Sequence, residues 1–189
     1  MKKILCYLYE GFVDFEISLA LTEINLDEKF QVIYAAYEKK LLKSSSGLTI
    51  KPDIAVSEIT SSNDYEALII PGGFVRPLKP EFKELILDFN KTNKLIAAIC
   101  GGPEFLANAG LLENRKYTTS MFPSDYEEKN EPDPFPRKNY LETRVVRDAH
   151  IITARGNAFV DFALEIWDWF DLYEYDNEKE ECKEIYSPV

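Results

Sequence analysis

The stretch KLIAAICGGPEFLANAG, residues 94–110, joins an apolar run to a helical pattern across an abrupt turn. Residues 95–100 are apolar without alternation, which is typical of a parallel strand buried on both faces. Two glycines then permit a sharp turn, and Pro103 suits the first turn of a helix, where no N–H donor is needed. The segment therefore predicts a strand that ends at Cys100, followed at once by a helix over 103–109.

Strand and helix patterns alternate along most of the chain. Apolar runs at 2–8, 30–36 and 65–71 predict three further buried strands. Helical patterns lie between and after these strands, at 12–27 and 159–170. Between them is a one-sided apolar stripe, Phe82, Leu85, Ile86 and Phe89, which predicts another helix. Residues 143–156 alternate about a turn and predict an antiparallel pair. These elements predict an α/β sandwich with a mostly parallel sheet.

Two segments depart from this alternation. Residues 121–141 contain four prolines and no apolar periodicity, so we expect a long surface loop, which is a common place for function. Residues 171–189 are acidic and predict a C-terminal extension that either frays or docks. The remaining length suits one core, so we expect a single α/β domain over 1–170.

The composition excludes several classes of protein. With 33 acidic and 22 basic residues the net charge is −11, which repels phosphate backbones, so we expect no nucleic-acid partner. No apolar run approaches the roughly 20 residues of a membrane span, and the N-terminal run is too short for a signal peptide. We therefore expect a cytoplasmic protein with no membrane partner.

Three cysteines and one histidine limit the chemistry further. Cys6, Cys100 and Cys182 are odd in number and far apart, which indicates reduced thiols rather than a disulfide framework. With His150 as the single imidazole and no Cys-x-x-Cys motif, a zinc site is not expected. No other pattern indicates a metal or cofactor. Cys6 lies mid-strand and is expected in the core, whereas Cys182 falls in the C-terminal extension.

Cys100 lies where a reactive thiol is expected in such a fold. Ligands of open parallel sheets bind at the carboxyl ends of the strands, and this cysteine ends one of them. The turn aims its side chain at a helix N-terminus, whose unpaired N–H groups and dipole favour a thiolate. The same arrangement with serine is the nucleophile elbow of other folds. The competing interpretation is a buried cysteine that only fills space.

Glu16 is the second candidate. Its neighbours at helical spacing are all apolar: Phe12, Val13, Leu19 and Ala20. The carboxyl group therefore lies on a face that should pack inward, where burial raises its pKa and lets it donate a hydrogen bond to a thiolate. The alternative is a glutamate that reaches solvent at the edge of the helix.

A glycine pair follows the strand over 65–71 as well. Gly73 and Gly101 can turn two backbone N–H groups toward an incoming oxygen and form an oxyanion hole. Phosphate binding is the competing idea, but the chain has neither G-x-G-x-x-G nor a Walker lysine. Since glycine pairs are also frequent in ordinary turns, this signal is weak by itself.

The chain resembles members of the ThiJ/PfpI superfamily over roughly residues 2–170. The resemblance rests on five features in this order: Glu16, PGG (71–73), AAICGGP (97–103), YTTS (117–120) and ITARG (152–156). The resemblance implies a flavodoxin-like three-layer sandwich of the class I glutamine amidotransferase type, in a homodimer or larger assembly. It also implies Cys100 as nucleophile, Glu16 as its carboxyl partner, and the amides of Gly73 and Gly101 as the oxyanion site. Members carry the names of proteases, amidases, chaperones, glyoxalases, deglycases and oxidative-stress sensors, so the resemblance predicts fold better than reaction.

The sequence departs from this family at the usual histidine. Protease-like members carry it directly after the cysteine, where this chain has Gly101. Others carry it at the end of the strand after the elbow helix, where this chain has Ser120. His150 lies in a predicted hairpin and is not expected to reach Cys100. General acid–base help is typically worth about 10²–10⁴ in rate, so amide hydrolysis needs a substitute base. The candidates are Glu16, Ser120 and three acids of the 121–141 segment, Asp125, Glu127 and Glu128.

Three functions are compatible with these residues. A Cys100 thiolate tuned by Glu16 can add to small reactive carbonyl compounds or respond to oxidants, because neither reaction has a leaving amine to protonate. The second is an amidase or peptidase with a base other than histidine. The third is a homodimeric binding protein without turnover. We expect the first, with a small-molecule substrate that no motif identifies.

Overall fold

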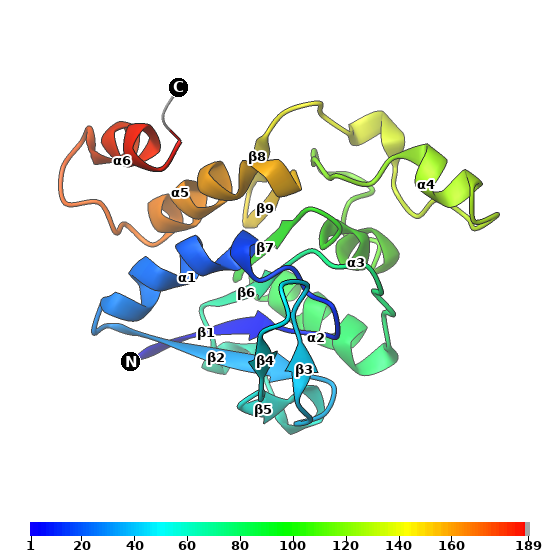
Figure 1. Cartoon of the computed structure of the whole chain (residues 1–189), viewed down its shortest axis with the longest axis horizontal. Helices are drawn as coiled ribbons and strands as arrows, with labels where there is room; N and C mark the ends of the chain where they lie inside the picture. The colour runs from blue at the N-terminus through cyan, green and yellow to red at the C-terminus, as the bar shows by residue number, and fades with distance from the viewer. Residues whose placement is uncertain (188–189) are drawn as a thin grey trace.

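A seven-stranded sheet with helices on both faces forms the centre of the computed structural model, which describes residues 1–187 (Figure 1). The strands lie in the order β5-β2-β1-β6-β7-β9-β8. Their bounds are β1 (Lys2–Tyr7), β2 (Phe30–Ala36), β5 (Ile54–Ala55), β6 (Ala67–Ile70), β7 (Leu95–Ile99), β8 (Val145–Asp148) and β9 (Ile151–Ala154). Neighbouring strands are parallel except β9 and β8, which form an antiparallel pair at one edge. The predicted mostly parallel sheet is confirmed.

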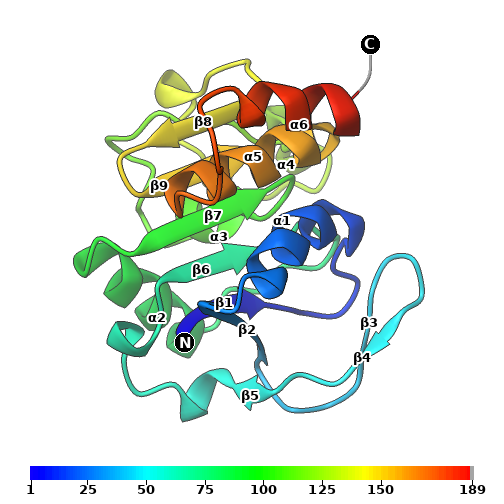
Figure 2. The same cartoon turned by 90° about the vertical axis from the view of Figure 1, so that its left-hand side faces the viewer.

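Helices cover both faces of this sheet (Figure 2). On one face α1 (Phe15–Leu26) packs against α5 (Phe159–Trp169), and α6 (Glu178–Tyr186) packs on α5. On the other face lie α2 (Pro80–Lys91) and α3 (Pro103–Asn108). The apolar stripe expected for the second of the predicted helices is buried in α2: Phe82, Leu85, Ile86 and Phe89. The three-layer sandwich is therefore the observed architecture.

The register of the central strands creates one common edge. All residues of β6 and β7 are buried, which explains why their sequences are apolar without alternation. Ile70 pairs with Ala98, and Ile99 pairs with Ala154, so β6, β7 and β9 end close together. The segments that leave these three ends carry Gly72, Cys100 and Gly156 to the same place.

The remaining elements are short. They are the hairpin β3 (Leu42–Lys43) and β4 (Thr49–Ile50), the helix α4 (Pro123–Glu127), and the 3₁₀ turns η1 (Val56–Glu58), η2 (Ser62–Asp64), η3 (Arg137–Asn139) and η4 (Gly156–Ala158). None of the helices over residues 1–187 has the length and apolar character that crossing a bilayer requires.

One expectation about an irregular segment needs correction. Residues 121–141 are not a plain loop, because they contain α4 and η3, with a proline in the first turn of α4 and Phe135 stacked on the buried Tyr117. Residues 117–120 precede this segment and form only an isolated bridge, between Tyr117 and Tyr140. In both places side-chain contacts between distant segments, rather than local pattern, decide the backbone path.

The C-terminal extension docks. Lys179 pairs with Glu165 at 2.7 Å and Lys183 with Asp161 at 3.1 Å, which ties α6 to α5. The ring of Tyr186 contacts Trp167 edge to face. Residues 188–189 of the predicted extension lie outside the described residues.

Candidate functional site

Cys100 lies in the turn that directly follows β7, because the strand ends at Ile99, one residue before the end that we predicted. Its backbone φ is 62°, in the left-handed region that residues with a side chain rarely adopt. Such a conformation costs on the order of 1–3 kcal/mol and persists only where the surrounding structure imposes it. Two hydrogen bonds hold the Cys100 carbonyl here, from the Thr119 hydroxyl at 2.7 Å and the Ser120 amide at 3.0 Å. The corner has the backbone geometry of a nucleophile elbow.

Glu16 lies beside this corner. It belongs to the first turn of α1, and only 3% of its surface is exposed, so the predicted inward orientation is confirmed. Its carboxyl group is in hydrogen-bond contact with the Cys100 thiol. The Gly72 amide donates to Glu16 Oε2 at 2.7 Å. The structure therefore brings together the two side chains that the sequence singled out.

Gly72 and Gly156 enclose this pair from two sides. A Cβ at Gly72 would lie 2.5 Å from Glu16 Oε2 and 3.0 Å from Cys100 Sγ. A Cβ at Gly156 would lie 2.8 Å from Cys100 Sγ and 2.9 Å from Glu16 Oε1. Real Cβ atoms do not come this close, so both positions require glycine for the thiol and the carboxyl group to meet.

Burial dominates the proton equilibria of the pair. It raises the pKa of Glu16 from 4.5 to about 6, against the opposing effect of hydrogen bonds from Cys100 and Gly72. Burial and the neighbouring Glu16 charge also raise the pKa of the Cys100 thiol, to about 12. Donors from Ser120 and Gly101 oppose this second shift without reversing it. The direction is opposite to the predicted stabilised thiolate: both shifts favour the protonated forms, so burial opposes a thiolate at Cys100.

Ser120 is a third member of the site. Its Oγ accepts a hydrogen bond of 2.8 Å from the Gly156 amide, which leaves the hydroxyl proton free to point to the Cys100 sulfur. The Gly101 amide also contacts this sulfur. A donor pair of this kind stabilises negative charge on sulfur as it develops. Ser120 was predicted as an auxiliary residue, and the structure brings it to the thiol.

Gly73 follows Gly72 in the turn after β6. It forms an antiparallel bridge with Phe12 in which the Val13 amide donates to the Gly72 carbonyl at 2.9 Å. In this type of pair the N–H and C=O of Gly73 itself point away from Phe12. The Gly73 carbonyl accepts from Arg76, whose guanidinium lies 3.1 Å from where a Cβ of Gly101 would be. Gly73 and Gly101 therefore both lie beside the Arg76 guanidinium, and the oxyanion hole formed by their amides stays a prediction.

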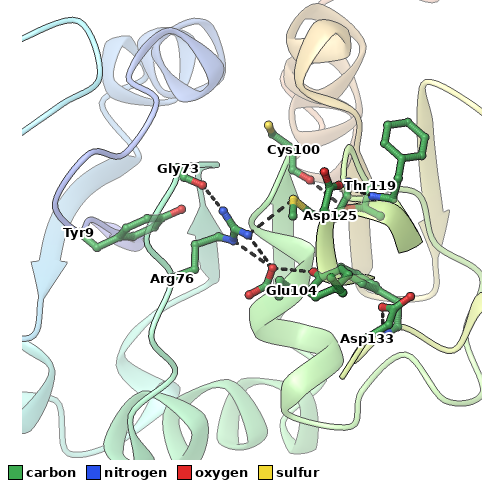
Figure 3. A network of polar contacts seen from close by, with 12 residues as sticks. Tyr9, Gly73, Arg76, Cys100, Glu104, Thr119, Asp125 and Asp133 are labelled. Carbon is green, nitrogen blue, oxygen red and sulfur yellow. Dashed lines mark hydrogen bonds and ion pairs between the residues drawn. The ribbon is translucent and has the colours of Figure 1, made fainter. Parts of the chain in front are cut away.

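Arg76 links this backbone to the neighbouring helices (Figure 3). Its guanidinium lies between the Gly73 carbonyl and Glu104, with an ion pair of 2.6 Å to the latter. The Tyr126 hydroxyl donates to the same Glu104 oxygen at 2.7 Å, and Met121 Sδ lies 3.6 Å from Arg76 Nη2. The network ties the 121–141 segment to the turn after β6 and to the first turn of α3.

The other candidates do not reach the site. His150 lies at the amino end of β9, a strand length from Cys100, and its Nε2 contacts Asn90 Oδ1 at 3.0 Å. Cys6 is fully buried in β1, as predicted. Cys182 lines a cavity of 440 Å³ at the far end of α1 from Glu16.

The acids of the 121–141 segment are also placed elsewhere. Asp125 Oδ2 accepts from the Phe122 amide at 2.6 Å and so caps α4. Glu127 and Glu128 are exposed on the surface of the segment. Of the proposed substitutes for histidine, the structure therefore brings only Glu16 and Ser120 to Cys100.

Sequence reasoning gave no role to four residues that shape the site: Gly72, Gly156, Arg76 and Arg155. A glycine after β9 was a usable signal, because β9 ends beside β7 and the positions after both ends must meet. Arg76 carries no local signal, since its partner Glu104 lies 28 residues away in the sequence.

Comparisons with known proteins agree with this geometry. The model of the DJ-1/PfpI family matches residues 2–168. A Bacillus subtilis protein named as an uncharacterized protease, YoaZ, is 29% identical over 181 residues, 91% of this chain and 85% of that protein. The glutathione-independent glyoxalase DJR-1.2 of Caenorhabditis elegans is 32% identical over 162 residues, 80% of each chain. The crystal structure of a thiJ/pfpI family protein from Bacillus anthracis has a TM-score of 0.84 and 29% identity, and covers 100% of this chain and 92% of that chain.

Proposed function

The chain belongs to the DJ-1/PfpI family, and from its site we propose that the Cys100 thiol adds to the carbonyl carbon of small reactive aldehydes and ketones. The observation that carries this proposal is the buried contact between Cys100 and Glu16, in a site that His150 does not reach. One relative carries the name of a glyoxalase, which supports a reaction at a carbonyl group.

Glu16 acts as the general base in this proposal. With a pKa of about 6 it is mostly ionised at pH 7 and still basic enough to accept a proton, which is the range in which general bases work best. As sulfur attacks the carbonyl carbon, the thiol proton passes to Glu16. The amides of Gly73 and Gly101 stabilise the oxyanion, which then takes the proton from Glu16 to give a hemithioacetal.

Amide hydrolysis is the weaker alternative, although one relative is named as a protease. It needs a second proton transfer, to a leaving nitrogen, from a group placed on the far side of the scissile bond. Glu16 already serves the thiol, and Ser120 is oriented by Gly156 toward the sulfur. No further acid of the described residues contacts Cys100.

A redox response is a second candidate, and the donors around the sulfur favour it. Ser120 and Gly101 both donate to Cys100, so an oxidised sulfur with additional oxygens would find hydrogen-bond donors in place. Sulfenic and sulfinic acids are the first products of thiol oxidation. Graded peroxide followed by mass mapping of proteolytic peptides tests this: oxidation confined to Cys6 and Cys182 contradicts it.

The carbonyl proposal is tested by the pH dependence of thiol loss with methylglyoxal. In the wild type the initial rate should rise as pH passes about 6, because Glu16 must be ionised to accept the proton. In Glu16→Gln the rate at pH 7 should fall by roughly 10²-fold. Cys100→Ser sets the background from the other thiols. Equal rates at pH 7 in wild type and Glu16→Gln would refute the role of Glu16.

A further inference from the structure

Arg155 differs from every other arginine in its ion pairing. Five of the six arginines have a carboxylate partner: Arg76 with Glu104, Arg115 with Asp148, Arg137 with Asp133, Arg144 with Asp161 and Arg147 with Asp168. Across residues 1–187, Arg155 has no such partner, and its side chain donates no hydrogen bond. A guanidinium has five N–H donors, and 33 acidic residues are available in a chain of net charge −11. An unpaired arginine in this chain needs an explanation.

The position of Arg155 supplies an explanation for its missing carboxylate partner. It directly precedes Gly156, whose Cα lies against the Cys100 sulfur and the Glu16 carboxyl group. Its guanidinium lies 5.8 Å from the centre of the Phe122 ring, and Phe122 follows Ser120 by two residues. The cation is therefore held at the rim of the Cys100 site, between the end of β9 and the start of the 121–141 segment.

The contact with Phe122 orients the cation without neutralising it. An exposed cation–π contact contributes only about 0.5–1 kcal/mol and uses the face of the guanidinium, so the N–H groups at its edge stay free. The other arginine of the site differs in this respect, because Arg76 is neutralised by Glu104. Arg155 is thus the group at the site that can receive an anion in the bidentate geometry that guanidinium favours.

We propose that Arg155 is a substrate-binding residue, and that the carbonyl compounds taken by Cys100 carry a carboxylate or another anionic oxygen group. This inference rests on the proposed function for its carbonyl chemistry, whereas the anion site can be tested separately. Glyoxylate is the smallest such compound: an aldehyde that carries a carboxylate.

The reaction with glyoxylate needs no oxidant or reductant. A C–S bond forms between Cys100 Sγ and the aldehyde carbon as the π bond of the carbonyl opens. The thiol proton moves by way of Glu16 to the former aldehyde oxygen, which becomes a hydroxyl group. The carboxylate of glyoxylate is unchanged and pairs with Arg155.

The anion site is tested with two alkylating reagents of nearly equal size, iodoacetate and iodoacetamide. Both form a C–S bond with Cys100 and release iodide, but only iodoacetate carries a charge. The ratio of their rates cancels any change in the nucleophilicity of the thiol. We expect Arg155→Gln to lower the iodoacetate to iodoacetamide ratio by roughly tenfold or more, as for loss of a charged hydrogen bond. Arg155→Lys should give an intermediate ratio, because it keeps the charge without the fork.

The matched control is Arg147→Gln, which removes the same charge from an arginine of β8 that pairs with Asp168 of α5. It should leave the ratio unchanged. An equal loss in Arg147→Gln, or an unchanged ratio in Arg155→Gln, overturns the inference. If neither reagent modifies Cys100, the shift of melting temperature by glyoxylate decides, and no Arg155-dependent shift also overturns it.

The aldehydes then separate this inference from the proposed function. Thiol loss is compared for glyoxylate against methylglyoxal, and for glyceraldehyde 3-phosphate against glyceraldehyde, which distinguishes carboxylate from phosphate. An Arg155-dependent alkylation ratio without adducts from any aldehyde supports the anion site and refutes the carbonyl reaction. Adducts that form equally with charged and neutral aldehydes, in wild type and Arg155→Gln, support the reaction and refute the anion site.

Discussion

Burial of Glu16 carries an energetic cost, which its proposed role as general base explains. The folded protein raises the pKa of this carboxyl group from 4.5 to about 6, so ionising it in place is harder than in the unfolded chain. A shift of this size corresponds to about 2 kcal/mol of lost stability once the group is fully ionised. A glutamine in this position keeps an oxygen to accept from Gly72 and has no charge to bury.

The pH dependence of stability tests this cost. Because the folded pKa of Glu16 is raised, its contribution is fully favourable below about pH 4.5 and is lost as pH rises through about 6. Glu16→Gln lacks this loss. Relative to the wild type, its free energy of unfolding should therefore increase by about 2 kcal/mol between pH 4 and pH 7.5. Urea titrations at the two pH values measure the difference, and a parallel dependence in both proteins contradicts it.

Gly156 is the position where one added methyl group should remove reactivity. Its Cβ would lie 2.8 Å from Cys100 Sγ, so Gly156→Ala must displace the thiol or the turn after β9. Misplacement of a reacting group by about 1 Å can cost roughly 10²-fold in rate, and we expect a loss of that order in alkylation of Cys100 by iodoacetamide. Asn157→Ala, at the exposed neighbouring position, is the control. Alkylation of Gly156→Ala at the wild-type rate would show that the thiol tolerates the methyl group.

At the scale of elements, α3 joins the site to the 121–141 segment through Glu104. The Tyr126 hydroxyl donates to this carboxylate at 2.7 Å, so Tyr126→Phe leaves the segment with one anchor fewer. A hydrogen bond to a charged group contributes about 1.5–3 kcal/mol, and we expect a loss of stability in that range. Faster proteolytic cleavage within 121–141 should accompany it.

The chain offers a matched control for this substitution. Tyr140 belongs to the same segment, and its hydroxyl is buried without a hydrogen-bond partner. Tyr140→Phe removes the same atom without breaking a bond, so stability and cleavage rate should stay at wild-type values or improve. Equal destabilisation by both substitutions would show that the Glu104 contact is not the anchor.

Elements whose patterns reflect burial alone were predictable. β7 is apolar throughout because both of its faces are covered, and the stripe of α2 faces the sheet at helical spacing. The meeting of Cys100 and Glu16 was also predictable, since parallel strands end at one edge and Glu16 has only apolar neighbours on its helix. The direction of the Cys100 pKa shift was not predictable, because it depends on how far burial outweighs the donors from Ser120 and Gly101. The lack of a carboxylate partner for Arg155 was not predictable either, because it depends on where every distant carboxylate lies.

At the scale of the whole molecule, the homodimer implied by family resemblance stays a prediction. Large apolar side chains are exposed in the turn after β6, between β3 and β4 and at the start of α1: Phe74 78%, Val75 68%, Leu48 56% and Phe15 54%. Exposed apolar groups mark interaction surfaces where they form a contiguous patch. We expect light scattering to give about twice the chain mass of 21.8 kDa.

Substitution separates this surface from others. Phe74→Asp should halve the measured mass, because an unpaired charge in an apolar interface is costly to bury. Leu26→Asp, at a position that is 70% exposed at the other end of α1, should leave the mass unchanged. A wild-type mass of 21.8 kDa would refute the homodimer itself.

The packing of α5 on α1 includes one directional contact, from the Trp167 indole N–H to the Ala20 carbonyl at 3.1 Å. Ala20 is one turn along the helix from Glu16, so any tilt of that helix which draws the carboxyl group from the sulfur also alters the surroundings of the indole. The emission of Trp167, one of two tryptophans in the chain, should therefore respond to movement of the helix that carries Glu16.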